Sequence, residues 1–96
     1  MMQEALNPDW YILVRAELKK KIKKIENVIH LGNYFKVLSY LDWIYESWLD
    51  RYVADDEVFD YVSNIDLLIK GEYDFVWKSG NPVTVFPYAK SKKYKR

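Results

Sequence analysis

The sequence predicts a mainly α (α+β) fold, in which a three-helix core is followed by a C-terminal β-hairpin and a basic tail. Apolar residues recur at spacings of three and four up to about residue 70, as they do on the buried faces of helices. From Tyr73 onward the spacing changes to two, which is typical of a strand. The length of 96 residues and the hydrophobic content of 50% fit a single domain, and we expect a folded core over residues 7–88 and a flexible tail over 89–96.

The first helix is predicted over residues 8–30. It begins at Asn7-Pro8-Asp9, which combines an Asn cap, a proline in the first helical position and an acid near the positive end of the helix dipole. His30 and Gly32 indicate the end of this helix, because both residue types are favoured at helix C-termini. One face carries an apolar stripe, which consists of Tyr11, Val14, Leu18, Ile22, Ile25 and Ile29.

A second helix is expected from the residue after Asn33 to about Tyr52, and a third from Asp55 or Asp56 to Gly71. The acids suit the N-terminal cap of the third helix, and the glycine suits its C-terminal end. The second helix has an apolar face too wide for one neighbour to cover, made of Tyr34, Val37, Leu38, Leu41, Ile44, Tyr45, Trp48, Leu49 and Tyr52. The predicted buried face of the third helix consists of Val58, Phe59, Val62, Ile65, Leu68 and Ile69.

A β-hairpin is predicted over residues 73–86. The aromatic residues Tyr73, Phe75 and Trp77 alternate with Asp74, Val76 and Lys78. Residues 83–86 are rich in β-branched and aromatic side chains. The segment Ser79-Gly80-Asn81-Pro82 between them consists of residues that favour turns.

Charge is sorted along the chain, although the net charge is only +1. Residues 15–24 hold six basic side chains and one acidic side chain, and residues 42–74 hold ten acidic and two basic ones. The last nineteen residues carry six positive charges and no acid. Such asymmetry favours electrostatic docking, either within the fold or with a partner.

No sequence pattern indicates catalysis. His30 is the only histidine and has no nucleophile beside it, the three glycines are isolated, and cysteine is absent. The acids at residues 55–57 and Asp60 are explained by the start of a helix. We therefore expect no enzymatic activity, cofactor, metal or small-molecule substrate. The chain begins without a signal-peptide pattern and its longest apolar run is Trp10–Val14, so we expect a cytoplasmic protein without a membrane partner.

Aromatic rings surround the second helix more completely than a three-helix core requires. Three of these rings, Phe35, Tyr40 and Trp43, are either covered by the hairpin or part of an interface. The acids Asp42, Glu46 and Asp50 stand four residues apart beside these rings, where they can pair with the first helix or with the basic end of a second molecule. We therefore predict a small protein that binds a protein partner or itself as a homodimer; its composition is typical of accessory regulators or inhibitors of phage or viral type. The predicted partner-binding residues are Phe35, Tyr40, Trp43, Asp42, Glu46 and Asp50.

The alternative function is nucleic-acid binding. Adjacent lysines on one helix face can neutralise several phosphates, although the same lysines can also form a merely solvated face. The residues predicted for this function are Lys19, Lys20, Lys23 and Lys24 in the first helix and Lys90, Lys92, Lys93, Lys95 and Arg96 in the tail.

Overall fold

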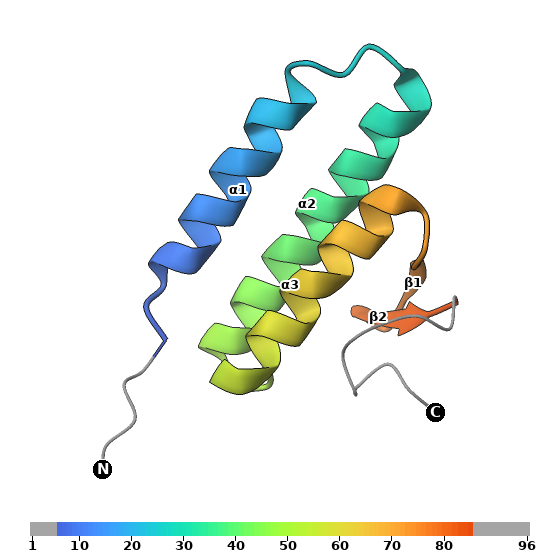
Figure 1. Cartoon of the computed structure of the whole chain (residues 1–96). Helices are drawn as coiled ribbons and strands as arrows, with labels where there is room; N and C mark the ends of the chain where they lie inside the picture. The colour runs from blue at the N-terminus through green and yellow to red at the C-terminus, as the bar shows by residue number, and fades with distance from the viewer. Residues whose placement is uncertain (1–5, 86–96) are drawn as a thin grey trace.

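The computed structural model describes residues 6–85 and contains three helices followed by a two-stranded antiparallel sheet (Figure 1). This arrangement confirms the predicted fold class. The elements are α1 (Asp9–Ile22), α2 (Val28–Leu49), α3 (Asp55–Lys70), β1 (Phe75–Lys78) and β2 (Asn81–Thr84). Residues 89–96, for which a flexible tail is predicted, lie outside the described residues.

The break between α1 and α2 falls at residues 23–27, so the predicted boundary near Gly32 is wrong. Asn27 caps α2, because its side-chain oxygen accepts hydrogen bonds from the backbone N–H groups of Ile29 (2.9 Å) and His30 (3.1 Å). This cap satisfies two of the N–H groups that every helix start leaves without a partner inside the helix. Gly32 consequently lies inside α2, and His30 lies in the first turn of α2 instead of the last turn of α1.

The turn between α2 and α3 also differs from the prediction in detail. α2 ends at Leu49, and Arg51 adopts the left-handed conformation with a φ of 63°. The N-cap of α3 is Ala54, whose backbone N–H donates to the Glu57 carboxylate at 2.9 Å. At the other end, Gly71 has a φ of 79° and ends α3 as predicted.

The β-hairpin is confirmed, with a tighter turn than predicted. The turn residues are Ser79 and Gly80, both with positive φ, so β2 begins at Asn81. Positive φ at both positions gives a two-residue turn whose twist matches that of the strands. Val76 pairs with Val83 on the solvent side of the sheet, while Phe75 faces inward and is fully buried.

α2 is the central element of the fold and is covered on several sides. α3 packs along α2, and α1 lies antiparallel to α2 on one flank. The hairpin lies on the side of the α2–α3 pair that is opposite to α1 (Figure 1). Tyr40, in the middle of α2, has an exposed fraction of 0%, and its ring centroid lies 4.9 Å from that of Phe75. Its hydroxyl accepts a hydrogen bond from the Asn64 amide of α3 at 3.0 Å. The hairpin therefore covers the Tyr40 side of α2, which is one of the two possibilities that the sequence left open.

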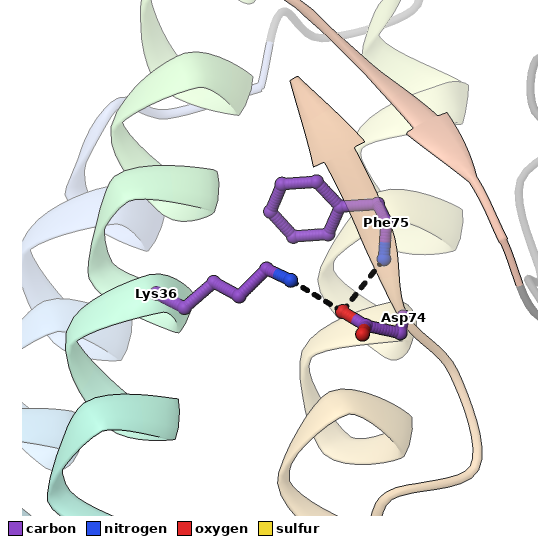
Figure 2. A network of polar contacts seen from close by, with 3 residues as sticks. All are labelled: Lys36, Asp74 and Phe75. Atoms are coloured by element: carbon purple, nitrogen blue, oxygen red, sulfur yellow. Dashed lines mark hydrogen bonds and ion pairs between the residues drawn. The ribbon is translucent and has the colours of Figure 1, made fainter.

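Polar contacts among Lys36, Asp74 and Phe75 connect the start of the hairpin to α2 (Figure 2). The Lys36 ammonium group and the backbone N–H of Phe75 both donate to the same Asp74 carboxylate oxygen, at 2.5 and 2.8 Å. The same ammonium group lies 4.7 Å from the centroid of the Phe75 ring, a distance at which a cation and an aromatic ring attract each other. Together these contacts fix the position from which the hairpin folds over α2.

Two residues predicted to be buried are exposed. Ile29 has an exposed fraction of 74%, because it lies in the first turn of α2 and not on the inner stripe of α1. Phe59 is 61% exposed, because the buried side of α3 is centred on Val58, Tyr61, Ile65 and their neighbours, and Phe59 lies across the helix from it.

Candidate functional site

One strip of α2 stays open to solvent along most of the helix. Five of its side chains follow one another at spacings of three or four residues, and Asp50, four residues after Glu46, completes the strip. They share one face and span about 22 Å at 1.5 Å per residue. Phe35 and Leu49 have exposed fractions of 53% and 55%, and the others are exposed except for Asp42, which is half-buried. We call this strip the α2 ridge; it consists of Phe35, Ser39, Asp42, Glu46, Leu49 and Asp50.

The acids of the α2 ridge lack cationic partners among residues 6–85. The ion pairs in this part of the chain are Lys20–Glu17, Lys36–Asp74 and Lys70–Asp66, and none of them reaches the ridge. The predicted pairing with the first helix is not formed among these residues. The α1 lysines lie at the end of the bundle where α2 begins, and the ridge acids lie in the second half of α2.

Two of these acids stand where helix electrostatics disfavour them. Glu46 lies in the last turn of α2 and Asp50 is its C-cap, and this last turn contains no basic residue. The C-terminal end of a helix carries a partial negative charge, so each acid there costs about 0.3–1 kcal/mol of stability. By contrast, several acids of α3 have local explanations. Asp56 lies in the favourable first turn, and Asp66 pairs with Lys70 at 3.0 Å.

Asp42 has a structural role at the edge of the ridge. Its carboxylate accepts a hydrogen bond from the Tyr11 hydroxyl at 2.6 Å, and this bond ties α1 to α2. The bond raises the pKa of Tyr11, because it stabilises the protonated phenol, and burial raises it further. The Tyr11 ring also stacks on Tyr45 at a centroid distance of 4.1 Å.

Asp55 forms further hydrogen bonds near the same end of the contact between α1 and α2, where α1 begins and α2 ends. Its carboxylate accepts hydrogen bonds from the Trp48 indole N–H at 2.6 Å and from the backbone N–H of Leu6 at 3.1 Å. These bonds lower the pKa of Asp55, with the bond from Trp48 as the largest cause. Asp55 is therefore engaged in joining the start of α3 to α2 and to the segment before α1.

The structure brings four of the six predicted partner-binding residues together on the ridge. Tyr40 lies about 120° around the helix from the ridge and is buried, so its ring is not on the surface. Trp43 is half-buried: its ring centroid lies 5.3 Å from that of Tyr61, and its indole N–H donates to the Asn81 side chain at 3.4 Å. Sequence reasoning missed Ser39 and Leu49, although their spacing from Phe35 already placed them on the same face.

The lysines predicted for nucleic-acid binding lie on and just after the last turns of α1. All four are exposed, and only Lys20 forms an ion pair in this part of the chain, with Glu17 at 3.8 Å. Lys21 is also exposed and extends the cluster. The predicted tail residues Lys90, Lys92, Lys93, Lys95 and Arg96 lie outside the described residues.

Among residues 6–85, no three His, Cys, Asp or Glu side chains are grouped so that they could hold a metal ion. None of the described helices combines the length and the apolar character needed to cross a membrane. Comparison of the chain with protein-family models, curated proteins and solved structures finds no match.

Proposed function

We propose that this is a small non-enzymatic binding protein that acts through protein–protein contacts made by the α2 ridge. The observation that carries the proposal is the placement of Glu46 and Asp50 at the C-terminal end of α2, with no cationic partner among residues 6–85, where they cost stability. Residues that reduce stability without an internal partner are typical of functional surfaces.

The chemistry of the ridge favours a basic protein partner with apolar pockets. Phe35 and Leu49 offer exposed apolar side chains, and aromatic anchors are enriched in protein interfaces. The three carboxylates between and beside them provide electrostatic complementarity, which sets specificity and association rate. Because α1, α3 and the hairpin pack on α2, the backbone of the ridge is already in its helical conformation before binding, so little backbone ordering entropy is lost. This description fits an accessory regulator or inhibitor of phage or viral type, and the partner can include a second copy of the chain.

The test compares two variants with the same change in charge. Glu46→Lys/Asp50→Lys alters the ridge, and the control Asp56→Lys/Asp60→Lys alters the exposed side of α3. The measurement is a quantitative pull-down from a nuclease-treated extract of the native cells. We expect the ridge variant to retain about one tenth of the partner protein that the parent retains, or less. A tenfold loss of affinity corresponds to only about 1.4 kcal/mol of binding free energy.

The stability of the ridge variant separates lost binding from lost folding. Lysines at the C-terminal end of α2 complement the helix dipole, so we expect this variant to unfold at least as high in temperature as the parent. Equal retention by the ridge variant and the parent contradicts the proposal. An equal loss in both variants, with the control shown to be folded by its thermal melt, also contradicts it, because the effect then follows net charge and not the ridge.

A second candidate function is nucleic-acid binding by the α1 lysines, which is favoured by their exposure and by the scarcity of ion pairs among them. Four phosphate contacts predict a slope of about −3.6 in log K against log salt, or about a 150-fold loss between 50 and 200 mM. Lys19→Gln/Lys23→Gln should lower the slope by about 1.8. Binding that is sequence-selective or insensitive to salt contradicts this candidate, and fluorescence anisotropy on unrelated duplexes measures both properties.

A further inference from the structure

The two ends of the helical bundle carry opposite charges, each beside exposed apolar side chains. At the end where α1 leads into α2, a group of lysines precedes Val28 and Ile29, whose exposed fractions are 80% and 74% (Figure 1). These fractions are the highest among the large hydrophobic residues of the described chain. We call this surface the basic end; it consists of Lys20, Lys21, Lys23, Lys24, Val28 and Ile29.

The opposite end of the bundle has the complementary chemistry. There the last turns of α2 present the C-terminal part of the ridge, Glu46, Leu49 and Asp50, which we call the acidic end. Leu49 is 55% exposed between the two carboxylates. Each end thus joins an apolar contact to a charge that the other end can neutralise.

The two ends are too far apart to neutralise each other within one molecule. From Val28 to Leu49 the α2 helix rises by about 32 Å, at 1.5 Å per residue. The Debye length is about 8 Å at physiological ionic strength, so the attraction across the molecule is screened. Among residues 6–85, Lys20 pairs with Glu17, and the other charges of both ends form no ion pair and remain available to another molecule.

We infer that the basic end of one copy docks on the acidic end of a second copy in a head-to-tail contact. This inference rests on the proposed function and names a second copy of the chain as a partner of the acidic half of the ridge. Since the two contacting surfaces differ, each docked copy keeps one basic and one acidic end free. Assembly therefore continues beyond two copies, unlike a symmetric dimer, which closes on itself.

The size of the ends makes the contact weak and dependent on salt. The shorter extents of the molecule, 31 and 21 Å, limit an end-on contact to roughly 500 Å² per copy, or about 1,000 Å² in total. This area is at the low end for specific interfaces, so assembly requires high protein concentration. Charge pairs at such an exposed contact are screened by salt, which should dissociate the assembly.

Sedimentation velocity between 10 and 500 µM protein, at 20 and 300 mM NaCl, tests the inference. At 20 mM NaCl we expect the mean mass to rise from the 11.6 kDa of one chain without a plateau at two copies, and to return to one chain at 300 mM. Neutralising either end, by Lys21→Gln/Lys23→Gln/Lys24→Gln or by Glu46→Gln/Asp50→Asn, should leave single chains. The control Asp56→Asn/Asp60→Asn removes as much negative charge from α3 and should assemble like the parent.

The decisive sample is an equimolar mixture of the two neutralised variants. Each pair in the mixture can form one intact contact and then presents only neutralised ends, so we expect growth to stop at two copies. A mixture that stays monomeric while the parent assembles overturns the inference, as does a plateau of the parent at two copies. A parent that is monomeric under all conditions overturns this inference alone, because the pull-down with the ridge variant still reports a different protein partner.

Discussion

Tyr40→Ala is expected to lower the free energy of unfolding by about 3–5 kcal/mol, the usual cost of removing a large buried ring. Tyr40 is fully buried, and its ring packs on Phe75 while its hydroxyl accepts a hydrogen bond from Asn64. The substitution therefore leaves a cavity at the point where α2, α3 and the hairpin meet. Against a typical total stability of about 5–15 kcal/mol, such a loss leaves a marginal fold.

The matched control for this prediction lies on the same helix. Phe35 is of similar size but half-exposed on the ridge, so Phe35→Ala should change the free energy of unfolding by no more than about 0.5–1 kcal/mol. Tyr40→Phe keeps the ring and removes the acceptor for Asn64, and we expect an intermediate loss of about 1–2 kcal/mol. Urea unfolding measures all three variants. Similar values for Tyr40→Ala and Phe35→Ala would show that the hairpin does not cover this side of α2.

Trp48→Ala is expected to lower the free energy of unfolding by about 3 kcal/mol and to loosen α1 in particular. The Trp48 ring centroid lies 5.7 Å from that of Trp10 and 6.1 Å from that of Tyr45, in the aromatic cluster that joins α1 to α2. Its indole N–H also donates to Asp55 at 2.6 Å. Hydrogen exchange should therefore accelerate more in α1 than in the interface between α2 and α3, because α1 packs mainly on α2.

Trp48→Phe is the control, since it keeps a smaller aromatic ring in the cluster and removes the hydrogen bond to Asp55. We expect it to cost less than half as much as Trp48→Ala, and to leave exchange in α1 close to that of the parent. If Trp48→Ala melts at the temperature of the parent, the aromatic cluster does not hold α1, and another contact must be responsible.

Local sequence signals predicted the elements well where only one signal was present. Gly71 and the change to alternating residues marked the end of α3 and the start of the hairpin without competition. Between α1 and α2 the prediction followed Gly32 and gave no weight to Asn27, which caps α2 in the structure. The apolar spacing of Ile25 and Ile29 runs across the break, so periodicity could not decide between them. The side-chain hydrogen bonds of Asn27 decide it in the structure.

For the candidate site too, the sequence predicted what depends on local spacing and did not predict what depends on distant contacts. The common face of Phe35, Asp42, Glu46 and Asp50 follows from helical spacing alone, so the sequence was sufficient to group them. Whether Tyr40 joins them depends on its contact with Phe75, which lies 35 positions away in the chain. No local pattern reports a contact at that separation. The sequence indicated charges of both signs on the first two helices, but it did not show that the α1 lysines lie at the end of the bundle away from the ridge acids.

A site-specific photo-cross-linker tests most directly whether the α2 ridge contacts a protein. It replaces Ser39 on the ridge and, as the control, Ser63 on the outer side of α3. The two positions are closely matched, because each serine is exposed and donates to the carbonyl of a Phe one turn earlier, Phe35 or Phe59. In native cells we expect covalent protein adducts, resistant to nuclease, from position 39 and not from position 63. Adducts of equal yield at both positions, or adducts at position 63 alone, would contradict the assignment of the ridge as the binding surface.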